Sequence, residues 1–216
     1  QLADPPPASP EAVTETVELI ANAENIVLMF GRMSANMDDW ERRLQLAELV
    51  GAGVITDLKN RVCFPTNHDL HVGAPSNWVG PQGQEELMAA DVVVVLDWVD
   101  LAGSLKPLAP RGGVRGKIVN CSLDSYVHNG WSADHFGMAP ADVPVLADPD
   151  VFIAQLLAGL NEKFNGNSRW SGGAKPKAEP PAQEEKAQDA AIAPRDIAYA
   201  LKEARGDREL TLTRVP

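Results

Sequence analysis

The chain has 216 residues, of which 44% are hydrophobic and 23% are charged, the balance of an ordinary water-soluble globular protein. Its formal net charge of -11 and its isoelectric point near 4.8 argue against a nucleic-acid partner or an anionic membrane surface, because both require a basic face. The sequence also has no continuous apolar run long enough to span a bilayer.

Two cysteines, Cys63 and Cys121, lie far apart and lack the Cys-x-x-Cys spacing of metal and redox motifs. This favours two reduced thiols in a cytoplasmic protein over a disulfide or a metal site. The amino terminus has no signal-peptide pattern, since an acidic start is followed by three prolines. Because the chain begins with glutamine instead of methionine, we expect a fragment or a processed segment of a longer protein.

The first part of the sequence predicts a helix followed by a β-α-β unit. Ser9, Pro10 and Glu11 supply an N-cap, a first-turn proline and a first-turn acid for a helix that continues to about residue 23. A continuous apolar strand is expected at 26–30, an amphipathic helix at 38–50 and a strand at 53–56. The inner face of the second helix is expected to carry Trp40, Leu44, Ala47, Leu49 and Val50. Its outer face is expected to carry Glu41, Arg42, Arg43 and Glu48.

The next part continues the alternation of helices and strands. We expect a short helix at 84–90, strands at 91–96, 116–121 and 143–146, and a helix at 150–164. The strand at 91–96 contains four consecutive valines and belongs at the sheet centre. The predicted class is therefore α/β, with an open parallel sheet of about five or six strands, helices on both faces and a Rossmann-like architecture.

Composition divides the chain into four parts. Residues 1–9 form a Pro/Ala linker, and 10–164 form the α/β domain. Residues 165–191 are rich in Gly, Pro, Glu, Lys and Ala, which favours a flexible linker. Residues 192–216 return to a helical pattern, which we expect to be the start of a truncated third domain.

The stretch from Asp57 to Gly73 is a long loop without helical or strand periodicity, and such loops are often functional. His68 and His71 could share a metal if they lay on a helix. Pro65 and a nearby aspartate indicate a turn instead, so a capped loop is expected. A second histidine pair, His128 and His135, has no nucleophile in a sharp strand-to-helix turn, and a structural or surface role is expected.

Candidate ligand-binding residues follow the first two strands, where open parallel sheets bind ligands. Gly31 is expected to let the chain turn, and Arg32 could bind a phosphate or a carboxylate. Asp57 and Lys59 complete the candidate cofactor-binding set: Gly31, Arg32, Asp57 and Lys59. The dinucleotide pattern GxGxxG is absent at this position.

Acidic and aromatic residues are also expected near this edge of the sheet. Asp97 and Asp100 follow the valine-rich strand and would repel a pyrophosphate unless a metal or an arginine intervened. Three tryptophans, Trp78, Trp98 and Trp131, fall in loops near the sheet edge. We expect them at a subunit interface in preference to a ligand rim.

The order of these segments resembles the central domain of thiamine diphosphate-dependent enzymes of the acetolactate synthase and benzoylformate decarboxylase type. The resemblance covers roughly residues 10–163 and rests on a series of segments taken in order. These are the strand ending in Gly31-Arg32, the helix end LAELVGA at 46–52, the pattern FP-x-x-H-x-L-x-x-G at 64–73, the strand AADVVVVL at 89–96, and VPVLAD at 143–148 before a helix.

The resemblance implies a parent enzyme of three α/β domains that uses thiamine diphosphate and Mg²⁺ to act on 2-oxo acids, as a lyase or transferase. In the family, the first domain supplies a catalytic glutamate, and the third holds the diphosphate through Mg²⁺ and a GDG…N motif. The present sequence contains no Gly-Asp-Gly. The resemblance thus predicts no catalytic residue and no metal ligand in this chain, and neighbouring pyrimidine- and diphosphate-binding domains as its partners in a homodimer or homotetramer.

The family's central domain binds FAD in the synthases, an adenine nucleotide in some relatives and nothing in others. Here the residues after the third strand are Asp97-Trp98-Val99-Asp100 instead of a glycine-arginine segment, which counts against FAD. A vestigial nucleotide site with a structural role is therefore expected. Two alternatives stay open: a free-standing module that binds FAD, NAD or ADP, and a purely structural assembly domain.

Overall fold

The computed structural model describes residues 4–58, 60, 63–73, 78–124, 141–175 and 191–208. The expectations for Lys59, His128, Trp131 and His135 lie outside these residues. The chain divides into two compact units, Gln1–Ala178 and Glu179–Pro216. The first unit contains the sheet, and the second contains one described helix, α6 (Pro194–Arg205), none of whose residues is buried.

A five-stranded parallel sheet in the order β2-β1-β3-β4-β5 forms the centre of the first unit. Its strands are β1 (Ile26–Phe30), β2 (Gly53–Thr56), β3 (Val92–Leu96), β4 (Lys117–Cys121) and β5 (Val143–Val145). The helices are α1 (Pro10–Asn22), α2 (Met37–Val50), α3 (Pro81–Ala89), α4 (Leu101–Leu105) with the 3₁₀ helix η1 (Lys106–Arg111), and α5 (Pro149–Phe164). This architecture confirms the predicted fold class.

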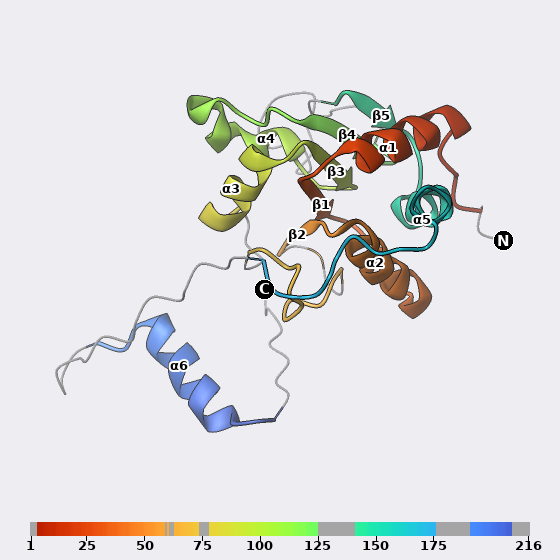
Figure 1. Cartoon of the computed structure of the whole chain (residues 1–216). Coiled ribbons are helices and arrows are strands. Elements are labelled where there is room, and N and C mark those ends of the chain that lie inside the picture. Colours follow the sequence, from red (N-terminus) through yellow and green to blue (C-terminus); the bar gives the residue numbers. More distant parts are fainter. Residues whose placement is uncertain are drawn as a thin grey trace. The chain divides into compact units, whose positions relative to one another are not determined.

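Helices cover both faces of the sheet, with α1, α2 and α5 on one side and α3 and α4 on the other (Figure 1). Leu28 and Phe30 of β1 belong to the core beneath the first group of helices. Val27 and Met29 belong to the core beneath the second group. Every residue of β1 and β3 is buried, which explains why both strands are continuously apolar.

Local sequence signals fix the ends of several helices. The Ser9 hydroxyl accepts a hydrogen bond from the Ala12 amide at 3.2 Å and caps α1. The Asp148 carboxylate accepts bonds from the Asp150 and Val151 amides and caps α5. Gly51 ends α2 with a φ of 66°, a conformation that favours glycine. The helical segment 101–111, in contrast, is absent from the sequence-based assignment.

Within the first unit, the segments before α1 and after α5 also pack against α5 and α2. The Asp148 amide donates to the Pro6 carbonyl at 2.9 Å, and the Gln155 side chain exchanges hydrogen bonds with the backbone of Ala8. After α5, the Arg169 amide donates to the Leu49 carbonyl at 2.8 Å. None of the described helices is long and apolar enough to cross a membrane.

Candidate functional site at the carboxyl edge of the sheet

The carboxyl ends of the parallel strands bring the candidate residues to one edge of the sheet. In the strand register, Phe30 lies opposite Thr56 on one side and Leu96 on the other. The residues that follow, Asp57 after β2 and Asp97 after β3, therefore flank Gly31. Open parallel sheets bind ligands at this edge.

Gly31 is required by a close approach between two backbone segments. Its amide donates to the Leu96 carbonyl at 2.9 Å, and the Arg32 amide donates to the Asp97 carbonyl at 2.9 Å. A Cβ atom at residue 31 would lie 2.1 Å from the Asp97 carbonyl oxygen. The space at Gly31 is thus filled by the backbone of Asp97, whose φ of 52° is itself unusual for a residue with a side chain.

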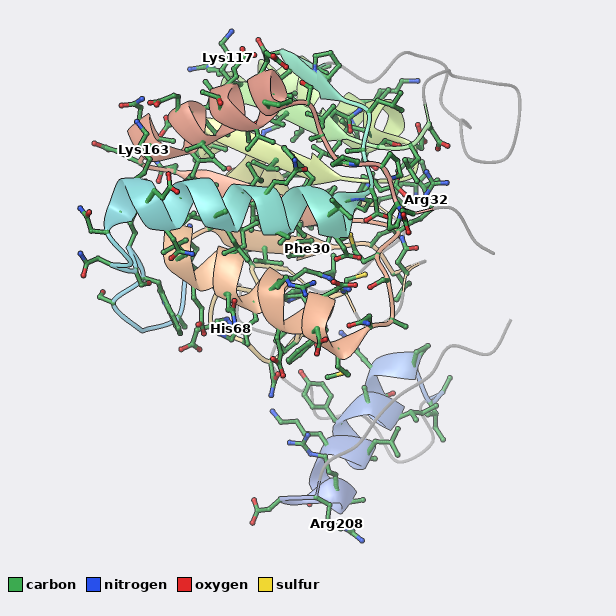
Figure 2. All side chains as sticks on the ribbon, turned by 90° about the vertical axis from the view of Figure 1, so that its right-hand side faces the viewer. Phe30, Arg32, His68, Lys117, Lys163 and Arg208 are labelled. Atoms are coloured by element: carbon green, nitrogen blue, oxygen red, sulfur yellow. The ribbon has the colours of Figure 1, made fainter. Side chains whose placement is uncertain are left out.

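Arg32 is held by two carboxylates. Its Nη2 atom donates to Asp97 Oδ1 at 2.8 Å and to Asp124 Oδ2 at 2.6 Å. Although burial disfavours the charged guanidinium, the hydrogen bonds and attraction of Asp97 and Asp124 raise the pKa of Arg32 above its ordinary value. Arg32 lies at the opposite end of the domain from Lys117 and Lys163 (Figure 2).

Ser122 extends this polar cluster to the end of β4. Its hydroxyl donates to Asp97 Oδ1 at 2.6 Å and accepts from the Asp124 amide at 3.0 Å. Asp97, one of the two acids that were expected to repel a pyrophosphate, therefore meets an arginine from the same chain. The other, Asp100, accepts a hydrogen bond from the Gly103 amide at 3.0 Å and caps α4. We name Arg32, Asp97, Ser122 and Asp124 the edge cluster.

Asp57, the other described member of the predicted set, is buried on the opposite side of β1 from Asp97. Its amide donates to the Phe30 carbonyl at 3.3 Å, and its own carbonyl accepts from the Asn60 amide at 3.2 Å. The strand register thus brings Gly31, Arg32 and Asp57 to one edge. The position of Lys59, the fourth member, lies outside the described residues.

Arg43 corrects the sequence-based assignment of the outer face of α2. Its side chain is fully buried, and its Nε donates to Asp150 Oδ1 at 2.9 Å. The guanidinium also donates to the Ser34 carbonyl at 2.7 Å and to the Cys63 carbonyl at 3.1 Å. Arg43 lies one and two turns before the buried residues Ala47 and Val50, so helical spacing alone places it on the apolar stripe.

Asp150 connects this buried pair to the segment that follows β1. Its Oδ2 atom accepts from the Ser34 amide at 2.9 Å, while its Oδ1 atom accepts from Arg43. The Ser34 hydroxyl donates to Asp39 Oδ2 at 2.7 Å. The network thereby fixes the path of the chain from Arg32 to the start of α2.

The two histidines of the long loop contact different partners. The His68 amide donates to the Pro65 carbonyl at 3.1 Å, which confirms the turn, and its Nε2 lies 3.2 Å from a Glu48 oxygen. His71 is buried, and its Nε2 lies 2.9 Å from Thr56 Oγ1. Phe64 stacks on Phe30 with ring centroids 5.8 Å apart. The loop therefore belongs to the core of the domain.

The backbone of this loop also covers the outer edge of the sheet. The Val54 amide donates to the Leu70 carbonyl at 2.8 Å, and the Val72 amide donates to the Val54 carbonyl at 3.0 Å. His71 forms an isolated parallel bridge with Val54. The edge strand β2 is thus protected against pairing with another chain.

The cysteines and one of the tryptophans are buried. Cys63 Sγ donates to the Gly31 carbonyl at 3.3 Å, and burial raises the pKa of Cys63 to about 11. Burial also raises the pKa of Cys121. Trp98, expected at a subunit interface, is instead a core residue whose indole N–H donates to Ser104 Oγ at 2.8 Å.

Within the described ranges, no three or more His, Cys, Asp or Glu side chains are grouped to hold a metal ion. The carboxyl edge is occupied by contacts within the chain. Gly31 has no room beside the Asp97 backbone, and Arg32 already binds two carboxylates. The arrangement stabilises the edge of the sheet by ion pairing and hydrogen bonds.

Comparison with known proteins identifies relatives of the chain. Residues 13–156 match the family model described as "Thiamine pyrophosphate enzyme, central domain". An acetolactate synthase of Mycobacterium avium is 29% identical over 148 residues, which cover 67% of this chain and 22% of that protein. A probable acetolactate synthase large subunit of Methanocaldococcus jannaschii is 26% identical, with 70% and 24% covered. The chain thus spans about a quarter of the length of these relatives.

Solved structures support the same fold. Benzoylformate decarboxylase from Polynucleobacter necessarius aligns with a TM-score of 0.66 and 19% identity, covering 96% of this chain and 36% of that one. A putative thiamin diphosphate-dependent enzyme from Mycobacterium smegmatis aligns with a TM-score of 0.58 and 16% identity, covering 94% and 36%. Since the family model matches most of the α/β unit, the chain belongs to the family of thiamine pyrophosphate enzyme central domains.

Proposed function

We propose that the chain is the structural central domain of a thiamine diphosphate- and Mg²⁺-dependent enzyme that acts on 2-oxo acids, with a vestigial nucleotide site and no catalytic activity of its own. The similarity to acetolactate synthases supports the substrate class. In this proposal the parent is a cytoplasmic homodimer or homotetramer, and the central domain contacts a pyrimidine-binding and a diphosphate-binding domain.

The edge cluster is the observation that supports a vestigial nucleotide site. A phosphate arriving at Arg32 would also meet Asp97 and Asp124, so two negative charges oppose it where one positive charge attracts it. Asp97 is nearly buried and is also bonded to Ser122. Binding of FAD, NAD or ADP would require displacement of at least one carboxylate, which disfavours all three ligands.

Thiamine diphosphate and Mg²⁺ belong to the parent enzyme in this proposal. In the parent enzyme, thiamine diphosphate would supply the carbanion-stabilising chemistry of the reaction. The described residues offer no ligand set suited to Mg²⁺, which prefers several oxygen ligands in octahedral geometry. We therefore assign the cofactor and its metal to the neighbouring domains, and no step of the reaction to this chain.

A free-standing nucleotide-binding module is the second candidate, and one observation favours it. Among the described residues, the buried Nε atom of Arg32 has no hydrogen-bond partner. A ligand oxygen that satisfied this donor would recover part of the cost of burying it, about 1–3 kcal/mol. The edge cluster opposes this candidate through the two carboxylates on the same guanidinium.

Calorimetric titration with FAD, NAD and ADP separates the two candidates. The structural assignment predicts no binding of any of the three below a dissociation constant of about 1 mM. Binding of one of them in the micromolar range would contradict the structural assignment and favour the nucleotide-binding module. Sedimentation of the same sample tests the assembly role, since a monomer at micromolar concentration would count against self-association through this domain.

A further inference from the structure

Residues 166–175 form a strap that crosses the amino edge of the sheet. The strap begins after α5, whose C-cap Asn165 has a left-handed φ of 51°. Its Arg169 amide donates to the Leu49 carbonyl at 2.8 Å, and the Ser168 hydroxyl donates to the Glu48 carbonyl at 2.6 Å. Both carbonyls belong to the last turn of α2, where backbone acceptors lack partners within the helix.

Arg169 binds the end of a second helix. Its guanidinium donates to the Ile20 carbonyl at 3.2 Å and to the Ala23 carbonyl at 2.6 Å, at the carboxyl end of α1. A positive charge is favourable at this end of a helix. The same guanidinium lies 5.6 Å from the centre of the Phe164 ring. One side chain thus joins the ends of α1 and α5 while its backbone joins α2.

The remaining part of the strap reaches the long loop beside β2. Trp170 packs on His68 with ring centroids 5.1 Å apart, and its indole N–H donates to the Gly173 carbonyl at 3.2 Å. The Lys175 amide donates to the Asp69 carbonyl at 3.1 Å. Lys175 Nζ lies 3.7 Å from Glu86 of α3. The chain is therefore led from the end of α5 to the β2 side of the domain.

The type of contact sets how firmly the strap is held. It is held by hydrogen bonds, a cation over a ring and the tilted packing of Trp170 on His68, and Ser168 and Arg169 are exposed. The sheet, in contrast, is fastened by fully buried side chains such as Leu28 and Val94. Segments with few buried apolar contacts open at a lower free energy than the core.

We propose that residues 166–175 are a latch, closed chiefly by Arg169, which opens without unfolding of the sheet. When closed, it holds Lys175 beside the 63–73 loop. When open, it frees the chain from the end of α5 onward and uncovers the His68 ring.

Hydrogen exchange of the full chain, followed by mass spectrometry, tests the latch. In Arg169→Ala, peptides that cover residues 166–175 should exchange roughly tenfold faster or more than in wild type, while peptides of β1 and β3 should exchange at the same rate. Arg169→Lys keeps the charge without the two-carbonyl fork and should give a smaller increase. Lys117→Ala is the control, because Lys117 pairs with Asp142 at the surface beside β4 and β5.

A second variant covers the case in which Arg169→Ala fails to fold. Ser168→Ala removes the hydroxyl that donates to the Glu48 carbonyl and accepts from the Trp170 amide, and it should accelerate exchange of the strap alone, by a smaller factor than Arg169→Ala. Unchanged exchange of the strap in folded Arg169→Ala or Ser168→Ala would overturn the proposal. A uniform acceleration across the strap and the sheet, or strap exchange at the rate of an unfolded chain in wild type, would overturn it as well.

Discussion

Gly31 shows how one missing side chain permits two strand ends to approach each other. Because a Cβ atom would lie 2.1 Å from the Asp97 carbonyl oxygen, any side chain here must displace backbone that is itself bonded to β4. From the sequence, Gly31 was expected to let the chain turn. The structure shows that a side chain at residue 31 would collide with the backbone of Asp97, which is more than sixty residues away in the sequence.

We expect Gly31→Ala to destabilise the domain by about 3 kcal/mol or more, because backbone cannot move aside as a flexible side chain can. Urea unfolding followed by circular dichroism measures the change. Gly80→Ala is the matched control, since nothing lies within 4 Å of a Cβ built at Gly80. Its stability should change by no more than about 1 kcal/mol. Equal effects of the two substitutions would show that the contact with Asp97 is unimportant.

The buried thiol of Cys63 predicts a dependence of stability on alkaline pH. Burial raises its pKa from 9.0 to about 11, so the folded domain keeps the thiol protonated where the unfolded chain has lost the proton. Stability from this group is complete below about pH 9 and is lost as the pH rises toward 11. Urea unfolding measures the loss between about pH 8, where this contribution is complete, and about pH 10.5, where part of it is gone.

Cys63→Ala separates this effect from other groups that titrate at alkaline pH. The variant should start from a lower stability, because it leaves a small cavity, but should lose less stability between the two pH values than wild type does. An identical loss in both proteins would exclude Cys63 as a source of the pH dependence.

At the scale of elements, a buried ion pair joins α2 to α5 in addition to their apolar contacts. Arg43 of α2 is fully buried against Asp150 in the first turn of α5, and both residues bind Ser34 after β1. Removal of one partner leaves an uncompensated charge in the core, so Arg43→Met should cost about 3–5 kcal/mol. Arg111→Met, which breaks an exposed pair with Glu85, should cost less than about 1 kcal/mol.

A double-mutant cycle distinguishes the charge from the packing. If Asp150 is the reason for the loss, Arg43→Met combined with Asp150→Asn should cost clearly less than the sum of the two single substitutions. Additive losses would instead assign the effect of Arg43 to its packing and to its bonds with the Ser34 and Cys63 carbonyls. The free energy of unfolding in urea is the measured quantity for all three variants.

Most elements of the first unit were predictable because their signals are local. Continuous apolar runs indicated β1 and β3, and Asp148 before Pro149 indicated the start of α5. The helical segment 101–111 was missed because two prolines and a glycine interrupt its pattern. Arg43 was placed on the outer face because charge was given more weight than spacing, and the partner that permits its burial is 107 residues away.

The candidate site was predictable only in part. The rule for parallel sheets brought Gly31, Arg32 and Asp57 to one edge, as the structure also does. Asp124 and Ser122 were missed because they become partners of Arg32 and Asp97 only through the order of strands, β1 beside β3 and β3 beside β4. Residue types alone suggest that an arginine pairs with acids. Which acids pair with Arg32 depends on the order of the strands in the sheet.

For the molecule as a whole, the proposed structural role depends on the ion pairs at the carboxyl edge of the sheet. At this edge, Arg32 is bound by two acids of its own chain. Under the proposed function, the domain contributes shape and stability to a parent enzyme, and the neighbouring domains supply its chemistry.

Calorimetric titration of ADP into wild type, Asp124→Asn and Asp142→Asn tests this account most directly. Asp124→Asn removes one carboxylate from Arg32, whereas Asp142→Asn makes the same change of charge beside Lys117, at the other end of the sheet. We predict no binding to wild type or Asp142→Asn below about 1 mM, and at least about tenfold tighter binding to Asp124→Asn. Micromolar binding to wild type, or no difference between the two variants, would contradict the account.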